Sequence, residues 1–494
     1  MSGPAGPPPP GRPPAVAIVG GGIAGLAAAQ ALREAGAAVT VLEGSPRIGG
    51  KLAVSPVAGI EIDAGAEALL ARRPEGVDLI TDLGLAGQLR EPGTTTAGIW
   101  TRGEIRPLPR RQFLGVPADL DELAASGLLS PAGLARARQD TDLPATSGAG
   151  AGDGAPDVSV TEGVGRRLGQ ELVDRVVEPL LGGVYAGRCE DLSFQATLGP
   201  LAAAAPRFRA LSAAAASLLP PAAGPASPPR PVFTTLAGGL GSLPPRLAAA
   251  SGAEIRTRAT VRELTRTAGG WRLTIGSARA PQWLDADAVI LALPARPASR
   301  LLSQVAGAAD AAAALAEIRY ASMAVITLAY PEAAFPAPPG GSGFLVPAVD
   351  GHAVKAVTFS TVKWPHLRDA GPGQGEPGLH IVRCSVGRLG DEAVLQRDDG
   401  ELAGLAEADL AAAAGVRGRP ADVRVTRWGG GLPQYSVGHL GRVARIRAGV
   451  GAQPGLAVCG AAYDGVGIPA CIASAQLAVN QVLSHLRSRH TAVP

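Results

Sequence analysis

Aromatic and sulfur-containing residues are scarce in this chain of 494 residues. Phe, Trp and Tyr together make up 3% of it, and it has four cysteines and two methionines. The cysteines form no CxxC pair and no histidine lies at metal-ligand spacing, which argues against a structural zinc site. We expect reduced thiols at all four positions, Cys189, Cys384, Cys459 and Cys471.

An excess of one charge and a long apolar run are also missing. Lys and Arg total 45 against 42 Asp and Glu, a net charge of +3, and no basic run alternates with aromatics, so no nucleic acid is expected as a partner. No uninterrupted apolar span of about 18 residues predicts a transmembrane segment. Residues 1–14 lack the apolar core of a signal peptide and are predicted to be a disordered tail. We expect a cytoplasmic protein, with peripheral membrane contact left open.

The strongest local pattern is rich in glycine and lies near the N-terminus. A buried strand is predicted at Ala15–Val19, followed by Gly20-x-Gly22-x-x-Gly25 and a helix from Leu26 to Ala35. The first glycine permits a tight turn, the second lets a pyrophosphate approach the backbone, and the third lets the helix pack on the strand. The helix N-terminus offers free N–H groups to the phosphates. The pattern predicts a dinucleotide site.

The residues that follow indicate which dinucleotide is bound. A second strand, Ala38–Leu42, ends at Glu43, which can accept hydrogen bonds from both ribose hydroxyls. Arg47 to Lys51 then read R-x-G-G-K, a pattern similar to that of flavoproteins resembling the amine oxidases and phytoene desaturases. Its glycines would let the chain pass close to the pyrophosphate, and the adjacent base would meet the phosphate charge. The predicted cofactor is FAD.

A second glycine-rich block lies near the other end of the chain. A buried strand beginning at Leu456 leads into Gly460 and a turn at residues 465–468, and Pro469 begins a helix predicted to reach Leu486. The positive end of this helix would point at the pyrimidine edge of the flavin and stabilise its reduced form. We expect the two blocks to converge on one flavin.

The stretch between the two blocks begins with a strand and continues with helices. Gly59–Asp63 predicts a short strand before Gly65, where the missing side chain gives clearance for the flavin ring. Residues 108–201 are mostly helical in pattern, with helices at 120–128 and 131–139 that Asp119 and Ser130 would cap.

Further on, the pattern changes from low complexity to strands. Residues 146–157 predict a loop, and residues 202–229 are low-complexity Ala/Pro sequence to which no site is assigned. Four strands, expected to form one antiparallel sheet, are predicted at 323–330, 343–349, 353–360 and 379–386.

Taken together, five blocks resemble the oxygen-dependent porphyrinogen oxidases of heme synthesis over nearly the whole chain. The blocks are Val19–Lys51, Arg166–Gly169 with Val177–Gly187, Leu236–Leu240, Leu432–His439 and Gly460–Cys471. The second and fourth are specific, since amine oxidases and desaturases lack them.

The resemblance implies an α/β fold with three parts. These are a discontinuous Rossmann-like FAD-binding domain, a mixed β-sheet substrate domain and an inserted α-helical domain. The expected bounds are 15–68, 230–300 and 428–490 for the first, 69–98 and 301–427 for the second, and 99–229 for the third.

The resemblance also implies non-covalent FAD whose N5 accepts a hydride, with no catalytic side chain. Arg72 and Arg73 are candidate partners for substrate carboxylates. The implied FAD contacts are Gly20, Gly21, Gly22, Ile23, Ala24, Gly25, Glu43, Gly44, Arg47, Gly50, Lys51, Gly65, Ala66, Glu67, Ala68, Val261, Trp428, Gly460, Ala461, Val466, Gly467 and Ile468.

The implied reaction removes six electrons from coproporphyrinogen III to give coproporphyrin III. Oxygen would be the acceptor and hydrogen peroxide the product, in line with the lack of a second GxGxxG for NADPH, and a ferrochelatase would receive the porphyrin. Protoporphyrinogen IX is the alternative substrate. An amine or carotenoid oxidoreductase of the same fold, and a carrier protein without catalysis, are the other hypotheses.

Overall fold

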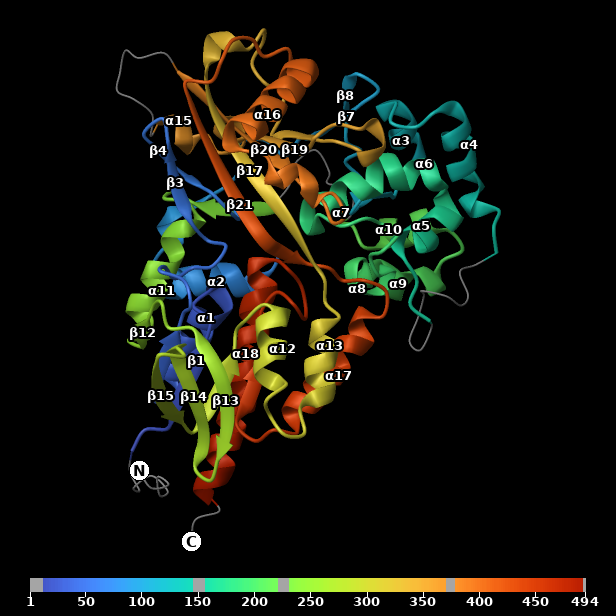
Figure 1. Ribbon diagram of the computed structural model, residues 1–494. Coiled ribbons are helices and arrows are strands. Elements are labelled where there is room, and N and C mark those ends of the chain that lie inside the picture. The colour runs from blue at the N-terminus through green and yellow to red at the C-terminus, as the bar shows by residue number, and fades with distance from the viewer. Residues whose placement is uncertain (1–11, 145–155, 221–230, 370–377, 492–494) are drawn as a thin grey trace.

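The computed structural model describes residues 12–144, 156–220, 231–369 and 378–491. Figure 1 shows three parts: a parallel sheet with its helices, which carries both chain ends, a second sheet beyond it, and a group of short helices to one side. The predicted loop at 146–157 and the predicted tail at 1–14 lie mostly outside the described residues.

The parallel sheet has five strands in the order β12-β2-β1-β16-β22. Their bounds are β1 (Ala15–Val19), β2 (Ala38–Leu42), β12 (Glu254–Arg256), β16 (Ala288–Leu291) and β22 (Leu456–Val458). β1 and β16 are almost wholly apolar because both faces of this sheet are covered.

Different elements cover the two faces. Val16 and Ile18 pack under α1 (Ile23–Glu34) and α18 (Ile468–Thr491), which lie side by side although they come from opposite ends of the chain (Figure 1). Ala17 and Val19 face the other layer. That layer consists of the ribbon β13 (Val261–Thr267), β14 (Gly270–Ser277) and β15 (Ala280–Ala286) and of helices α12 (Ala295–Leu302), α13 (Ala309–Ala316) and α17 (His439–Gly451).

Both predicted N-terminal strands are confirmed at their predicted bounds. Helix α1, however, begins at Ile23, three residues before the predicted start at Leu26. The glycine motif therefore does not merely precede the helix, because Gly25 lies in its first turn and Gly22 is its N-cap.

The second sheet has seven strands in the order β21-β17-β20-β19-β18-β7-β8. Their bounds are β7 (Gly98–Thr101), β8 (Glu104–Pro107), β17 (Tyr320–Pro331), β18 (Gly343–Leu345), β19 (Val354–Phe359), β20 (Leu379–Val386) and β21 (Asp422–Pro433). The four predicted strands share this sheet and pair antiparallel to one another, as expected. The whole sheet is mixed, because β7, which lies more than 200 positions upstream, joins it and pairs with β18 in parallel. The expected domain boundary at 428 falls inside β21.

One face of this sheet packs on α16 (Asp399–Ala414), with Ile326, Val382 and Leu402 in the shared core. The opposite face carries Arg383 on β20, which donates to Gly65 O in the turn after β4, and Lys355 on β19, which donates to Gly387 O at the end of β20.

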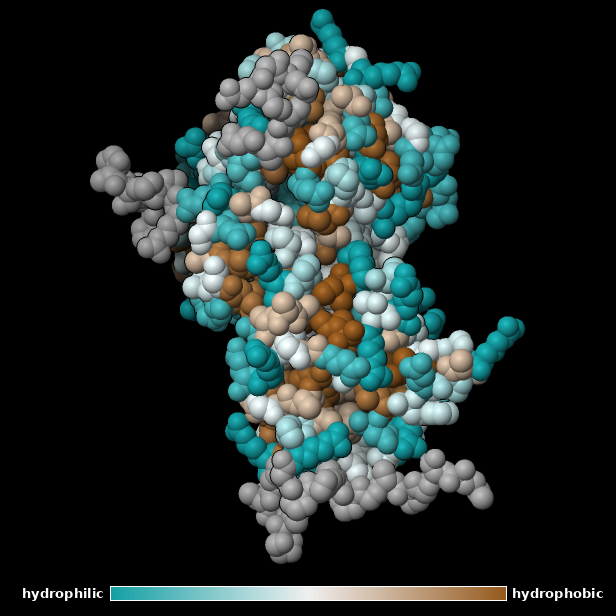
Figure 2. Space-filling model, turned by 90° about the vertical axis from the view of Figure 1, so that its left-hand side faces the viewer, coloured by the Kyte–Doolittle hydropathy of each residue, from teal (hydrophilic) through white to brown (hydrophobic). Residues whose placement is uncertain are grey.

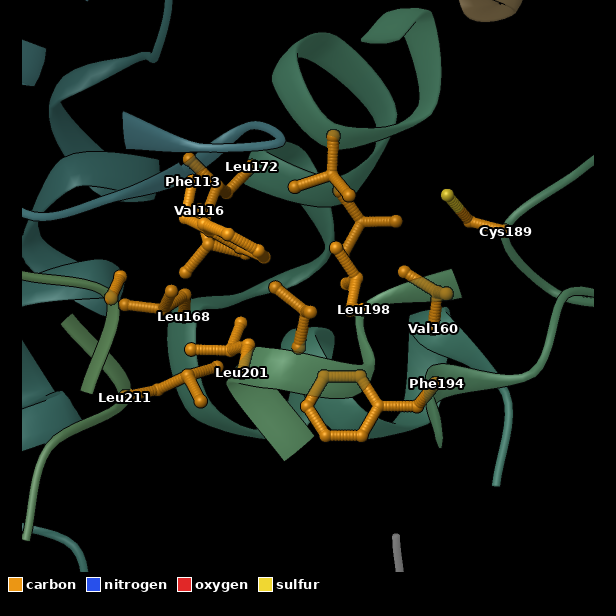
Figure 3. Packing of buried hydrophobic residues seen from close by; sticks show 14 of the residues in the cluster. Phe113, Val116, Val160, Leu168, Leu172, Cys189, Phe194, Leu198, Leu201 and Leu211 are labelled. Carbon is orange, nitrogen blue, oxygen red and sulfur yellow. The ribbon is translucent and has the colours of Figure 1, made fainter. Parts of the chain in front are cut away.

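The helical part has its own apolar core, shown in Figure 3, where Leu168, Leu172, Leu198 and Leu201 turn toward Phe113 and Val116. Its elements are β9 (Gln112–Phe113), β10 (Val116–Pro117), α3 (Leu120–Ser126), α4 (Pro131–Arg138), α5 (Val160–Leu168), α6 (Gln170–Leu172), a π-helical turn (Val173–Val177), α7 (Glu178–Tyr185), α8 (Phe194–Thr197), α9 (Gly199–Ala204) and α10 (Leu211–Ser217).

Two sequence expectations bear on this part. The caps are confirmed, since Asp119 accepts the N–H groups of Asp121 and Glu122, and Ser130 accepts that of Gly133. The low-complexity stretch, to which no site was assigned, contributes to this core over its described residues, 202–220. Helix α10 buries Leu211, Ala214 and Ala215 in the core, since alanine is the best helix former and packs closely.

Short elements join the parts. These are β3 (Val54–Val57), β4 (Ile60–Asp63), β5 (Leu69–Leu70), α2 (Pro74–Asp82), β6 (Leu89–Arg90), β11 (Phe233–Leu236), α11 (Leu243–Ser251), α14 (Ser360–Lys363) and α15 (His366–Asp369). Helix α2 packs against α18 through Gly76 and Pro469.

The described surface mixes polar and apolar side chains, and Figure 2 shows brown patches interrupted by teal over one face. Large exposed apolar residues come from separate elements, among them Val54, Phe233, Trp283 and Leu477. In the described ranges we find no helix with the length and hydropathy of a membrane span. The same ranges hold no cluster of His, Cys, Asp and Glu fit for a metal ion, and all four cysteines are free and buried.

Candidate active site

The two glycine-rich blocks meet at one edge of the parallel sheet. The chain leaves β1, β16 and β22 at adjacent positions: the N–H of Ala292 donates to Val19 O (2.8 Å) and that of Cys459 to Leu291 O (3.1 Å). Neighbouring strands lie about 4.8 Å apart, so the carboxyl ends of β1 and β22 are separated by about 10 Å. Gly20 and Gly460 therefore open onto the same edge, as expected.

The turn between β1 and α1 is built from close backbone contacts. A Cβ atom on Gly25 would lie 1.9 Å from Gly20 O, and Gly20 itself has a φ of +111° that a side chain would strain. A Cβ atom on Gly22, by contrast, would meet nothing within 4 Å. Gly22 gives α1 no side-chain cap, so the first N–H groups of this helix have no side-chain acceptor at its positive end. This geometry fits a pyrophosphate.

Glu43, at the end of β2, is held in place by two backbone N–H groups. Its Oε2 accepts the N–H of Gly21 (2.8 Å) and its Oε1 that of Ser45 (2.7 Å). The N–H of Ala259 donates to Glu43 O (2.8 Å), which brings Val261, the first residue of β13, close to Glu43 and Gly44. β13 therefore begins beside the end of β2, where the ribose and the adenine of a dinucleotide are expected.

The R-x-G-G-K segment lies against the first glycine turn. The N–H of Gly49 donates to Gly21 O (2.8 Å), and a Cβ on Gly50 would lie 3.4 Å from the Cα of Gly22. Arg47 uses its guanidinium to hold its own loop, donating to Gly50 O at 2.7 Å. The ammonium of Lys51 makes no hydrogen bond or ion pair within the described residues, and burial lowers its pKa. Lys51 is therefore a half-buried amine beside the first glycine turn that has no counter-charge among the described residues.

The predicted flavin-side turn closes against the same loop. A Cβ on Gly65 would lie 2.0 Å from Lys51 O and 3.0 Å from Cζ2 of Trp428. Trp428 donates its Nε1–H to Ala64 O (3.0 Å), and the guanidinium carbon of Arg47 lies 5.8 Å from the centre of its ring. Trp428, which comes from β21, thus lies against residues 47–66, and its contact with FAD stays a prediction.

Glu67 has a role that the sequence did not show. Its carboxylate accepts from Lys363 Nζ (2.6 Å) and from the Arg383 guanidinium, and Arg383 also donates to Gly65 O (2.6 Å). Burial acts to raise the pKa of Glu67, but the two cations outweigh it and lower the pKa to about 2. The Glu67 side chain is therefore committed to this ion cluster, and Arg383 fixes the Gly65 carbonyl.

A charge inside an apolar strand was the signal that could have revealed this cluster. Arg383 lies on β20, where its neighbours along the strand are mostly buried and apolar. A buried guanidinium needs a carboxylate partner, so its position pointed to a contact with another part of the chain.

The block Leu236–Leu240 serves to fix the hairpin β3–β4. Asp63, at the end of β4, accepts the N–H groups of Leu240 (2.9 Å) and Gly241 (2.8 Å). Burial raises the pKa of Asp63 to about 6, although both N–H groups act to lower it. A Cβ on Gly239 would lie 2.9 Å from this carboxylate, so only glycine fits there.

The two arginines proposed for the substrate lie at the start of α2. Arg73 is the N-cap of α2 and pairs with Glu75 (2.6 Å), while Arg72 is exposed. Neither makes a contact with the ion cluster of Glu67, Lys363 and Arg383 that the structure records, and their role stays a prediction.

The C-terminal block passes from β22 to α18 through residues 459–468. A Cβ on Gly460 would meet nothing within 4 Å, and α18 begins at Ile468 with Pro469 in its first turn. Val466, Gly467 and Ile468 therefore form the approach to a helix N-terminus at the site edge. Burial raises the pKa of Cys471 to about 11, so this thiol is protonated at neutral pH.

The features at this sheet edge fit FAD. They are the uncovered backbones of Gly22 and Gly460, the N-termini of α1 and α18, the fixed carboxylate of Glu43, and Lys51, which is unpaired among the described residues. A family model described as flavin containing amine oxidoreductase matches residues 23–483. The chain belongs to this family. It is an FAD-dependent oxidoreductase with the α/β fold that the sequence predicted.

Similar proteins cover nearly the whole chain. It is 38% identical over 479 residues to a protein of Mycobacterium tuberculosis (strain ATCC 25618 / H37Rv) named coproporphyrinogen III oxidase, covering 96% of this chain and 98% of the relative. A Bacillus subtilis protein of the same name is 31% identical over 483 residues, with the same two coverages. A crystal structure from Exiguobacterium sp. 255-15, provisionally named a protoporphyrinogen oxidase, matches with a TM-score of 0.81 and 30% identity over 96% of this chain and 99% of that one.

Proposed function

We propose that this chain oxidises coproporphyrinogen III to coproporphyrin III in heme biosynthesis, removing six electrons. One observation supports this most strongly: relatives named for that substrate match 96% of this chain and 98% of their own length.

The residues at the sheet edge bind and orient the cofactor. The N–H groups at the start of α1 and Lys51 take the pyrophosphate, Glu43 takes the adenosine ribose, and Val261 meets the adenine through its backbone. Further proposed contacts, from Gly65–Ala68, Trp428, Gly460, Ala461 and Val466–Ile468, line the flavin ring. FAD, when bound, supplies the hydride acceptor.

The substrate chemistry needs no strong base from the chain. A methylene bridge between two electron-rich pyrroles yields a hydride because the pyrrole nitrogens stabilise the resulting cation. The chain must hold that carbon beside the flavin and exclude water. The four propionates require cations, for which Arg72 and Arg73 stay the proposed partners.

Oxygen is the proposed electron acceptor, with hydrogen peroxide as product, and the porphyrin passes to a ferrochelatase. The proposed location is the cytoplasm, with peripheral contact to a membrane left to experiment. Protoporphyrinogen IX is the second candidate substrate, because a distant relative and a similar crystal structure carry its name.

A steady-state comparison tests the proposal. Purified holoenzyme is given coproporphyrinogen III, protoporphyrinogen IX and a panel of primary amines, and oxygen uptake, peroxide and porphyrin fluorescence are recorded. We expect the largest kcat/KM for coproporphyrinogen III. A larger value for protoporphyrinogen IX would favour the second candidate, and turnover of amines without porphyrin fluorescence would refute both.

A further inference from the structure

Residues 434–439, which we call the junction segment, follow β21 and contact all three parts of the molecule. Gln434 donates its Nε2–H to Tyr185 O in the helical part (2.7 Å) and its backbone N–H to Arg319 O beside the second sheet (2.9 Å). The N–H of Ser193 donates to Tyr435 O (2.7 Å), which ties the segment to the helical part a second time. The proposed flavin site gives this segment no role.

The hydroxyl of Tyr435 bridges two points of the C-terminal glycine loop. It accepts the N–H of Gly465 (2.7 Å) and donates to Ala461 O (2.8 Å). Tyr435 is 2% exposed, and burial raises its pKa, so the hydroxyl keeps the proton that it donates. One side chain thus sets the distance between the two ends of residues 461–465, immediately before α18.

His439 holds the middle of the same loop. Its ring stacks on that of Tyr435, with centres 3.8 Å apart and planes 14° apart, and its Nε2 lies 3.2 Å from Tyr463 O. A carbonyl only accepts, so Nε2 carries the hydrogen. His439 is fully buried, and burial lowers its pKa to about 4, which leaves the ring neutral at pH 7. Loop residues 461, 463 and 465 are all bound by one stacked pair.

We infer that Tyr435 and His439 are positioning residues that set where the N-terminus of α18 points at the flavin. The inference rests on the proposed flavin site, in which residues 460–468 approach the pyrimidine edge. A helix N-terminus favours negative charge, and a reduced flavin carries such charge at that edge. Release of the loop should therefore weaken binding of reduced FAD more than binding of oxidised FAD.

The test compares Tyr435→Phe with Tyr185→Phe, each of which removes one phenolic hydroxyl. Tyr185 is a matched control because its ring lies 5.4 Å from that of Tyr435, while none of the hydrogen bonds to residues 461–465 comes from its hydroxyl. FAD dissociation constants and two-electron midpoint potentials are measured on the full chain without substrate. We expect about tenfold weaker binding of oxidised FAD in Tyr435→Phe and a further tenfold for reduced FAD, a potential about 30 mV lower. Tyr185→Phe should match the wild type.

A second pair of variants keeps the test decisive if Tyr435→Phe does not fold. His439→Leu removes the donor to Tyr463 O, whereas His439→Gln retains an N–H that can reach it. We expect a lowered potential in His439→Leu and a partial return in His439→Gln. Unchanged potentials in Tyr435→Phe and His439→Leu, or an equal shift in Tyr185→Phe, would overturn the inference. Because no substrate enters these measurements, a wild type that binds FAD but oxidises no porphyrinogen would refute the proposed function alone.

Discussion

The edge of the parallel sheet supports the site in one way, and the contacts of Glu67 and of the junction segment support it in another. At the edge, the contacts are made by backbone: Gly25 against Gly20, and Gly49 against Gly21. Around Glu67 and in the junction segment, side chains make the contacts, as in the ion pair of Glu67 with Arg383, two residues that lie 316 positions apart in the sequence. The first region holds a cofactor by leaving space for it, while the second fixes the turns that surround this space.

This difference explains which of the two regions can be predicted from the sequence. A glycine turn is local, so its pattern spans a few consecutive residues and can be found without a fold. The partners of a buried ion pair or a bridging hydroxyl come together only when the chain has folded, and no spacing rule links their positions.

The largest expected effect is the loss of FAD binding when the first glycine turn is altered. Gly22→Val should weaken FAD binding at least about 100-fold, since the side chain would occupy the space of the pyrophosphate. A Cβ at Gly22 meets nothing within 4 Å, so the variant should fold. The measurement is the FAD dissociation constant by flavin fluorescence.

The control for this variant is Gly441→Val, on the exposed face of α17, where a Cβ also meets nothing within 4 Å. It should bind FAD as the wild type does. Flavin retained by Gly22→Val at wild-type affinity would remove the glycine turn from the site.

The next effect concerns stability and comes from loss of the Glu67 carboxylate. Glu67→Gln leaves two cations, Lys363 and Arg383, without their counter-charge and should lower the free energy of unfolding by about 3 kcal/mol. The same substitution at Glu75, whose partner Arg73 is exposed, should cost less than about 1 kcal/mol. Urea unfolding midpoints measure both. Equal losses at the two positions would show that the cluster acts as a surface pair does.

The pH dependence of stability tests whether His439 is buried in its neutral form. Its folded pKa of about 4 lies below an unfolded value of about 6.5, so stability is lost as pH falls from 6.5 toward 4, by about 2 kcal/mol at pH 5. Its charged neighbours are Arg442, which lowers its pKa, and Asp464 and Asp157, which raise it.

The comparison is between urea midpoints at pH 7 and pH 5 in the wild type and in His439→Gln. The variant should lose less stability than the wild type over this range. Asp63, whose pKa is raised to about 6, adds stability to both proteins as pH falls, so it cancels in the comparison. Identical pH dependences would mean that His439 titrates normally.

The smallest expected effect concerns the exposed arginines. Arg73→Ala should raise KM for coproporphyrinogen III about threefold and leave kcat unchanged, since a solvent-exposed cation contributes little. Glu75→Gln, which frees the guanidinium, should leave KM unchanged or lower it. An unchanged KM in Arg73→Ala would exclude this residue from the substrate site and turn attention to the half-buried Lys363 and the buried Arg383.

The sequence predicted what depends on nearby residues. Both N-terminal strands, the caps at Asp119 and Ser130, the cofactor and the family are confirmed. The FAD contacts and domain bounds stay predictions. The features that the sequence did not predict are non-local: the parallel pairing of β18 with β7, the partners of Glu67, and helix α10 within low-complexity sequence. In each, tertiary packing decides what the local pattern leaves open.

Anaerobic titration of the oxidised holoenzyme with coproporphyrinogen III tests the central claim most directly. The claim is that both glycine-rich blocks hold one flavin beside a porphyrinogen. We predict that the flavin absorbance bleaches as porphyrin fluorescence appears, with three flavins reduced per substrate molecule. A flavin that keeps its colour with each porphyrinogen and bleaches with an amine, or a wild-type chain that binds no flavin, would contradict it.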